Sequence, residues 1–326
     1  MQPTEGLQGD WRRRHDPKAL RDAVTEFLIV SGALRSGLID QVAERPYDVR
    51  ALARVAGLDR RVTERVVRAL VAYGVLMHTP MGLALTKAGK EAYHEVHGRQ
   101  RHTTLAATRT MRALFDLPKV LESGAPLGLG DDPAGLRDWI YAQAERDPKA
   151  MDAAAEAFME GLPEGAKVFD LGGGPGHMAR RFLDRGAVVT LADLPQVIEL
   201  VRSGLEATQG LRLVATDVTA GLPEGTYDAV YMGNLNILLP AEENLKLFGR
   251  VKDHVAEGGR VAVQTALRDR SPDAVWLAVM NALYVEAGDS WPLERYAEWA
   301  EAAGLGAPEV LDLDEAKRQQ LLLFQA

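Results

Sequence analysis

The sequence predicts an α/β fold, in which a parallel sheet with helices on both faces follows an α-helical winged-helix domain. From Lys167 onward, short apolar strands alternate with segments of helical periodicity, which is the pattern of a doubly wound sheet. The first hundred residues instead show helical spacing that ends in two short strands. The chain has 326 residues, enough for two domains with a substantial core.

Composition narrows the class of protein. The chain is 47% hydrophobic and 26% charged, which is typical of a globular protein. It has no cysteine, so disulfides and thiolate metal sites are excluded, and no metal site is predicted. No apolar run approaches the roughly 18 residues of a membrane span. The polar segment 1–16 lacks the apolar core of a secretory signal, so a cytoplasmic protein is expected.

Charge is unevenly distributed along the chain. Residues 1–100 hold 16 Lys and Arg against 12 Asp and Glu, whereas the remainder holds 22 against 34. The acidic part argues against a nucleic-acid partner there. The basic excess in the first hundred residues leaves a nucleic-acid partner possible for that part of the chain.

The first hundred residues show the order of elements of a winged helix-turn-helix. Asp48 is a candidate N-cap, and Gly37 and Gly57 are candidate helix ends. Helices are expected over 19–36, over 49–56 and from Asp59 or Thr63 to Val71, and strands over 75–78 and 83–85.

Two interpretations of this domain stay open. Arg60, Arg61, Arg65 and Arg68 would lie on the recognition helix of a DNA-binding protein. Alternatively they form a solvated helix face with acidic neighbours, and the domain serves for docking. Because the helices of residues 19–71 expose more apolar surface than one small domain can bury, we expect a homodimer through this region.

Three domains are predicted: a winged-helix dimerisation domain over 1–100, a helical connector over 101–162 and a catalytic domain over 163–326. Connector helices are expected over 101–114, 133–144 and 149–159, with a loop over 122–128. In the last domain, strands are expected over 167–171, 188–192, 211–215, 229–232 and 260–265, helices over 179–185, 195–207, 242–256, 273–287 and 293–303, and a closing hairpin over 309–313 and 320–325.

The most informative stretch is a glycine-rich turn between the first strand of this sheet and the next helix. It reads Asp170-Leu-Gly172-Gly-Gly174-Pro-Gly176-His177. Glycines allow positive φ and a close approach of the backbone to a ligand, and the following helix presents unpaired N–H groups. The turn therefore predicts a site for an adenosine-type cofactor.

Two cofactor classes fit the glycines differently. Gly174, Gly176 and Ala179 satisfy the spacing of a dinucleotide site. The stronger register places Asp170 before the glycines, which is the pattern of S-adenosylmethionine (SAM) methyltransferases. An acid in the turn suits a cofactor with a free amino group better than it suits a pyrophosphate.

Acids follow the next two strands as well. Asp193, in Ala-Asp-Leu194-Pro, is a candidate acceptor for both ribose hydroxyls. Asp217 is a candidate acceptor for the adenine amine, with Val218 packed on the ring. Each acid alone could be a helix cap or turn residue, but acids at three consecutive strand ends favour a cofactor site.

On these motifs, the chain resembles the SAM-dependent O-methyltransferases of plant and bacterial small-molecule type. The motifs are the glycine turn, Ala192-Asp-Leu-Pro195 and the Glu-Gly-Gly-Arg-Val segment over 257–261, and the resemblance covers nearly the whole chain. It implies a Rossmann-like class I sheet of seven strands with a reversed last strand, an intertwined dimer and SAM as cofactor. Expected cofactor-binding residues are Asp170, Gly172, Gly174, Gly176, Asp193, Leu194, Asp217, Val218 and Asn234.

One departure from this family concerns the catalytic base. The family usually carries a histidine a few residues after the fourth strand, within a segment that begins with asparagine. Here the segment is Asn234-Leu-Asn-Ile237-Leu-Leu, and Ile237 stands in place of the histidine. An isoleucine side chain cannot abstract a proton.

Three readings of the chemistry follow. The acceptor can be reactive enough to need only positioning beside the methyl group, which also suits carbon or nitrogen acceptors. Another residue can be the base; the candidates are His177, Glu243, Asn281 and Tyr284. Or the protein binds SAM and carries out a reaction other than methyl transfer.

The sequence therefore predicts a SAM-dependent methyltransferase for a small, flat, largely apolar acceptor, with oxygen the expected acceptor atom. The alternative from another class is a SAM-binding winged-helix regulator of transcription. Expected pocket residues are Phe115, Trp139, Met159, Met280, Tyr284 and Trp291.

Overall fold

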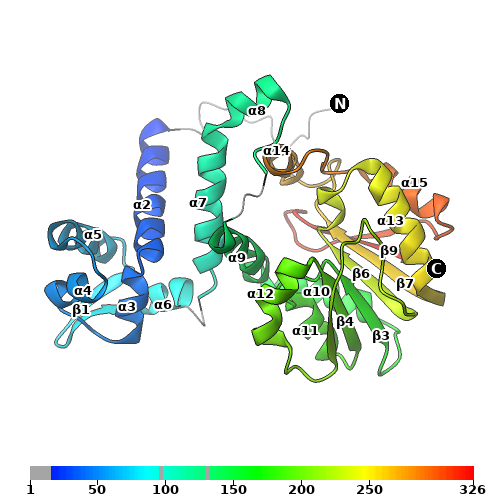
Figure 1. Cartoon of the computed structure of the whole chain (residues 1–326), viewed down its shortest axis with the longest axis horizontal. Coiled ribbons are helices and arrows are strands. Elements are labelled where there is room, and N and C mark those ends of the chain that lie inside the picture. The colour runs from blue at the N-terminus through cyan, green and yellow to red at the C-terminus, as the bar shows by residue number, and fades with distance from the viewer. Residues whose placement is uncertain (1–15, 95–97, 129–131) are drawn as a thin grey trace. The chain divides into compact units, whose positions relative to one another are not determined.

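The computed structural model describes residues 16–94, 98–128 and 132–326, and these form two compact units (Figure 1). The N-terminal unit contains the described residues up to 112 together with 133–145. The sheet unit contains the described residues of 113–132 together with 146–326. The polar N-terminal segment, for which no secretory signal is expected, lies outside the described residues except for Asp16.

The N-terminal unit begins with a winged helix. Capping supports the expected starts of its two central helices: the Asp48 carboxylate accepts from the N–H groups of Arg50 and Ala51, and that of Asp59 accepts from Val62 N–H. The elements are α2 (Pro17–Arg35), α3 (Leu38–Glu44), α4 (Val49–Val55), α5 (Arg60–Ala72), β1 (Leu76–Thr79), β2 (Gly82–Leu85) and α6 (Lys87–Tyr93).

The wing has a third, single-residue strand that the sequence analysis does not anticipate. Tyr47 forms an antiparallel bridge with Leu83, whose N–H donates to the Tyr47 carbonyl at 2.8 Å. Gly82 makes this approach possible, because a Cβ there would lie 2.6 Å from Tyr47 backbone atoms. The short helices α3 and α6 are also additional to the expected elements.

The segment predicted as a separate connector is shared between the two units. α7 (Arg101–Phe115, except its last turn), α9 (Pro133–Ala142) and η2 (Gln143–Glu145) belong to the N-terminal unit. α8 (Leu117–Ser123) and α10 (Pro148–Met159) belong to the sheet unit. Glu145 caps α7, since its carboxylate accepts from the N–H groups of His102 and Thr103 at 2.8 and 2.7 Å.

The sheet unit contains a seven-stranded sheet in the order β5-β4-β3-β6-β7-β9-β8, in which β9 is antiparallel to both neighbours and all other pairs are parallel. This confirms the expected doubly wound class with its reversed last strand. The strands are β3 (Lys167–Leu171), β4 (Val188–Asp193), β5 (Leu211–Ala215), β6 (Tyr227–Gly233), β7 (Val255–Thr265), β8 (Glu309–Asp312) and β9 (Gln320–Gln325).

The helices of this unit follow the strands as the alternating pattern predicts. They are α11 (His177–Leu183), α12 (Pro195–Leu205), α13 (Ala241–His254), α14 (Ala274–Tyr284) and α15 (Leu293–Ala302). The largest difference lies after α13, where β7 begins at Val255, five residues earlier than expected. The Gly258-Gly259 pair lies inside this strand, where the register shifts and Gly258 has φ +71°.

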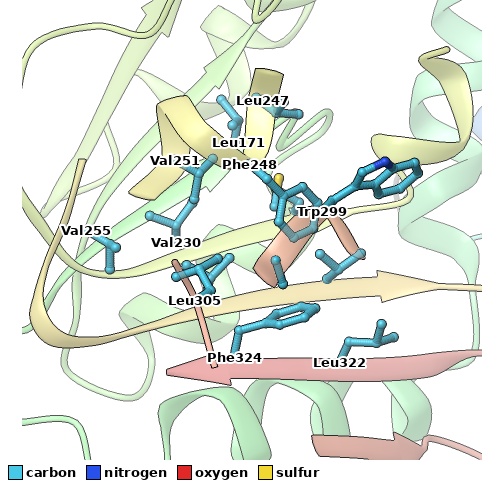
Figure 2. Packing of buried hydrophobic residues seen from close by; sticks show 14 of the residues in the cluster. Leu171, Val230, Leu247, Phe248, Val251, Val255, Trp299, Leu305, Leu322 and Phe324 are labelled. Carbon is cyan, nitrogen blue, oxygen red and sulfur yellow. The ribbon is translucent and has the colours of Figure 1, made fainter. Parts of the chain in front are cut away.

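Both faces of the sheet are covered. On one face, Val230 packs with Phe248 of α13, Trp299 of α15 and Phe324 of β9 in a buried cluster (Figure 2). On the other face, Tyr231 contacts the rings of Phe158 from α10 and Phe182 from α11, with ring centroids 5.2 and 5.1 Å apart. Successive residues of β6 thus point to opposite faces, and the carboxyl ends of the central strands are held between two packed layers.

Within the described residues, no helix combines the length and apolar character needed to cross a bilayer. Nor do the described residues contain a group of three His, Asp or Glu side chains arranged to hold a metal ion.

Candidate functional site

The glycine turn after β3 has the backbone that the sequence predicts. Gly172, Gly174 and Gly176 have φ of +72°, +51° and +73°, a region that favours glycine. A Cβ on Gly173 would lie 2.5 Å from Leu191 Cγ, whereas one on Gly174 would meet no atom within 4 Å. The turn is therefore closely packed on its sheet side and borders an unfilled space at Gly174.

Asp193, at the end of β4, holds this turn in place. One of its carboxylate oxygens accepts from Gly174 N–H at 2.8 Å, and the other from Leu194 N–H at 2.7 Å. Burial raises the pKa of Asp193, and these two hydrogen bonds oppose that rise. The next residue, Leu194, is also a predicted cofactor-binding residue. It is 37% exposed and is the N-cap residue of α12.

Asp170, at the end of β3, is the most perturbed acid of the site. It is only 2% exposed, and its Oδ2 has no hydrogen-bond partner among the described residues. Burial, followed by the nearby Asp193 carboxylate, raises the pKa of Asp170 to about 7. The structure thus brings two of the three predicted acids together at the glycine turn.

Asp217 has a more local role in the structure. Its Oδ1 accepts from Thr219 N–H at 2.9 Å and from the Thr219 hydroxyl at 2.8 Å. These hydrogen bonds lower the pKa of Asp217, as in an ordinary turn acid. Val218 is buried in the core cluster, and its carbonyl accepts from Arg250. A contact of either residue with adenine stays a prediction.

Asn234 follows β6 in a conformation that few residues adopt. Its φ is +54°, its N–H donates to the Gln264 carbonyl at 2.8 Å, and its side-chain Oδ1 is buried without a partner among the described residues. A non-glycine residue with positive φ at a strand end is a strained position of the kind that clusters at functional sites. This supports the prediction that Asn234 belongs to the cofactor site.

The next residues form the short turn η3 (Asn236–Leu238), which is held by uncharged groups. The Asn244 amide nitrogen donates to the carbonyls of Asn236 and Leu239 at 2.9 and 3.0 Å. Trp291 Nε1 also donates to the Asn236 carbonyl, at 3.1 Å. Ile237 is therefore fixed in position and only 5% exposed.

Two of the four candidate bases have surroundings that disfavour that role. Burial, followed by the charges of Arg146 and Arg181, lowers the pKa of His177 to about 3, whereas an effective base titrates near the working pH. Glu243 forms ion pairs with Lys246 and Arg250.

The other two candidate bases lie on α14. Asn281 donates its amide to the Ile237 carbonyl at 2.9 Å and so helps to fix η3. Tyr284 is half-buried at the end of α14. The roles of all four residues as bases stay predictions.

The predicted pocket residues have different surroundings. Phe115 is 84% exposed, Met159 is buried at the end of α10, and Met280 is half-buried on α14. Trp291 stacks edge-on against Trp299 and ties the loop before α15 to η3. Trp139 lies on α9 in the N-terminal unit. Their role toward a substrate stays a prediction.

Sequence reasoning missed some residues that shape this site. Tyr231 of β6 is the register partner of Asp170 on β3 and donates a hydrogen bond to Gln264 Oε1. Asn244 is fully buried together with the apolar residues Leu247 and Phe248 of α13. Arg146 acts electrostatically on both His177 and Tyr231. An asparagine among apolar helix positions is the only sequence signal, and it indicates Asn244 alone.

A comparison of the sequence with protein families finds one match. Residues 142–307, about half of the chain, match the model of a family described as a methyltransferase domain. No curated protein matches the chain in sequence.

Several solved structures share the fold. Human N-acetylserotonin methyltransferase in complex with SAM is 18% identical, with a TM-score of 0.75 over 98% of this chain and 99% of that one. An O-methyltransferase family protein from Burkholderia thailandensis is 18% identical, with a TM-score of 0.74 over 95% and 97%. The pyocyanin biosynthetic protein PhzM is 22% identical, with a TM-score of 0.68 over 97% and 99%. At these identities the likeness is one of fold.

The raised pKa of Asp170 predicts a pH-dependent cost to stability. Because the folded state retains a proton that the unfolded state releases above about pH 4, wild-type stability should fall as pH rises toward 7. Asp170→Asn mimics the protonated acid and avoids this loss. We expect its free energy of unfolding to match wild type near pH 4 and to exceed it by up to about 4 kcal/mol at pH 8.

Urea unfolding of both proteins between pH 4 and 8 checks this expectation. The titration of His177 affects both proteins and cancels in the difference. Asp217→Asn is the control, because the pKa of that exposed acid is lowered instead of raised. A difference between wild type and Asp170→Asn that stays constant with pH would contradict the assignment.

Proposed function

The chain belongs to the methyltransferase-domain family, and from that premise we propose that it transfers the methyl group of SAM to a small, flat, largely apolar acceptor. The observation that carries the proposal is the glycine turn, where Asp170 and Asp193 meet beside an unfilled space at Gly174. A cytoplasmic location stays a prediction from the sequence.

The residues of the turn fit the cofactor. SAM supplies an electrophilic methyl group on a sulfonium ion. The Asp193 carboxylate is suited to accept from the ribose hydroxyls, because each oxygen has lone pairs beyond the one it uses for a backbone N–H. Asp170 Oδ2 and Asn234 Oδ1 are buried acceptors without a partner among the described residues, and they suit the ammonium group of the cofactor.

Positioning is the proposed source of catalysis. By the sequence resemblance, Ile237 stands in place of the family's histidine base, and the turn around it is held by Asn244, Asn281 and Trp291. A fixed apolar wall can orient a flat acceptor and exclude water, and orientation alone can supply a large part of the rate. This arrangement suits an acceptor oxygen that ionises by itself, or a carbon or nitrogen nucleophile.

We also propose that the protein is a homodimer through its N-terminal unit. No residue in the first half of α2 is buried. Two leucines of this helix, Leu20 and Leu28, are 53% and 44% exposed. Beside α2 lies a cavity of about 450 Å³ whose lining includes Phe27, Tyr73 and Tyr93. An apolar helix face beside a cavity favours burial against a second copy.

Asp193→Ala should weaken the binding of S-adenosylhomocysteine by about 10- to 100-fold, because it removes a charged acceptor from the ribose. Isothermal titration calorimetry measures this. Asp253→Ala, an exposed acid on α13, is the control and should bind as wild type does. Asp193→Asn keeps an oxygen for Gly174 N–H and tests whether a loss comes from a disturbed turn. Unchanged affinity in Asp193→Ala, or tight NAD binding by wild type, would refute the cofactor assignment.

The dimer can be tested by light scattering at micromolar concentration. Wild type should have twice the mass of the chain, and Leu20→Glu/Leu28→Glu should be a folded monomer, because two buried carboxylates would oppose the contact. Leu245→Glu, at an exposed leucine of α13, should remain dimeric. A monomeric wild type would rule out the proposed assembly.

If positioning drives transfer, no single side chain should be indispensable as a base. We expect His177→Ala, Glu243→Gln and Tyr284→Phe each to keep kcat within about tenfold of wild type, since loss of a general base costs about 10²–10⁴. Rates would be measured with an acceptor found by screening, and they should follow the ionisation of that acceptor as pH rises.

The same assay distinguishes the competing readings. A loss of several hundredfold in one variant, with affinity for S-adenosylhomocysteine intact, would identify a replacement base. If SAM binds but no acceptor is methylated, the non-methylating reading takes the place of this one.

A further inference from the structure

In the N-terminal unit, α4 and α5 form a helix-turn-helix with a well-defined turn. Gly57 follows α4 with φ +66°, and the N–H of Leu58 donates to the Ala53 carbonyl at 2.8 Å. Asp59 then caps α5 through Val62 N–H at 2.9 Å. The two helices pack against each other, and the hairpin of β1 and β2 follows them (Figure 1). In a helix-turn-helix of a DNA-binding protein, the second helix enters the major groove.

The second helix, α5, has a buried face and an exposed face of opposite character. Its buried residues are Thr63, Val67 and Leu70. Its exposed side contains three arginines, Arg61, Arg65 and Arg68, which together are the arginine face of α5. At about 100° per residue, these three positions fall within a sector about 60° wide that lies roughly opposite the buried residues. The helix therefore presents all three side chains in one direction, away from the core of the domain.

The arginine face has no counter-ion among the described residues. The adjacent Arg60 is paired with Glu64 at 2.8 Å, whereas no Asp or Glu side chain that the structure describes lies within 4.0 Å of a guanidinium of the arginine face. The other nearby acid, Asp59, uses its carboxylate for the cap of α5. Three unpaired guanidinium groups on one side of a helix give that side a positive potential.

The charge of the surrounding segment has the same sign. From Asp48 to Lys90 the sequence holds eight Lys and Arg against three Asp and Glu, and all eight basic residues are exposed. The acidic excess of the chain lies after residue 100. At physiological ionic strength, exposed charges more than about 8 Å apart are largely screened from each other. The local excess of positive charge therefore determines which partner this surface attracts, although the whole chain is acidic.

We propose that the arginine face of α5 binds double-stranded DNA, with the helix in the major groove. This activity is separate from the proposed methyl transfer and does not depend on it. The planar guanidinium fork matches the oxygens of a phosphate through two parallel hydrogen bonds. The major groove of B-DNA is wide enough to admit an α-helix, whereas the deep, narrow major groove of an RNA duplex is not. The shape and the charge of the arginine face thus both favour a DNA duplex.

The proposed dimer contact and the arginine face use different parts of the N-terminal unit. The dimer proposal involves Leu20 and Leu28 of α2 and the cavity beside that helix, and no residue of the arginine face lines the cavity. A dimer would therefore present two arginine faces. Dimeric helix-turn-helix proteins use two such helices to contact two half-sites of one duplex.

Fluorescence anisotropy with a short labelled DNA duplex of mixed sequence tests the proposal on the full chain. Wild type should bind the duplex, with an affinity that falls as salt rises from about 50 to 200 mM. Arg61→Ala/Arg65→Ala/Arg68→Ala should bind at least about tenfold more weakly at the lower salt. Its slope of log affinity against log salt should be smaller by about two to three, because three phosphate contacts are lost.

A matched control separates the position of the charge from its amount. Arg185→Ala/Arg202→Ala/Arg212→Ala also removes three exposed arginines, but from the sheet unit. It should bind the duplex within about twofold of wild type, because distant exposed charges are screened. Circular dichroism shows whether each variant is folded, which we expect because alanine is the best helix former at the three positions of α5.

Several outcomes would overturn the proposal. Wild type could fail to bind the duplex at about 50 mM salt, the variant of the arginine face could bind as wild type does, or the control could lose as much affinity as that variant. Tighter binding to an RNA duplex or to vesicles of anionic phospholipid than to DNA would also overturn it and would assign the arginine face to that partner. None of these results bears on methyl transfer, which is tested by cofactor binding and by the acceptor assay.

Discussion

The hydrogen bond from Gly174 N–H to the Asp193 carboxylate is the interaction on which the candidate site depends. It continues a series in which the N–H groups of Gly172 and Gly173 donate to the Ala192 carbonyl, so three successive residues of the turn are tied to the end of β4. The turn therefore has its shape before any ligand arrives, which lowers the entropic cost of binding. The same contact brings the Asp193 carboxylate close to Asp170 in a buried setting, and the raised pKa of Asp170 is the electrostatic consequence.

The second part of the site, the turn after β6, is held by side chains that carry no charge. The turn at Asn236–Leu238 is held by the amides of Asn244 and Asn281 and by the indole of Trp291. None of these groups titrates in the working range of an enzyme. The turn around Ile237 therefore keeps its geometry as pH changes, while the glycine turn adjoins Asp170, the acid that responds to pH.

Much of the sheet unit could be predicted because its signals are local. The glycine turn, the acids at the ends of β3 and β4, and the bounds of β3 and β5 follow from residues that are adjacent in sequence. Asp48 and Asp59 identified their helices for the same reason. The short helices α3 and α6 were missed, because seven residues give little periodicity to read.

What could not be predicted depends on contacts distant in sequence. Tyr47 pairs with Leu83 across an intervening helix-turn-helix, and the indole of Trp291 reaches the Asn236 carbonyl. Arg146 reads as an ordinary residue before a helix cap, and its electrostatic effect on His177 and Tyr231 depends on tertiary structure. The assignment of connector helices to two different units is likewise a tertiary property, since their periodicity is the same in either place.

The way in which the two units share the chain has a consequence for synthesis on the ribosome. Every residue of the N-terminal unit has emerged once position 145 is clear of the exit tunnel, including the glutamate that caps α7. At that moment no strand of the large sheet has emerged, because β3 begins at Lys167. The N-terminal unit can therefore complete its own contacts first. The helix α8 has left the ribosome by then as well, but it must wait for α14, the partner on which it packs, until nearly the whole chain has been translated.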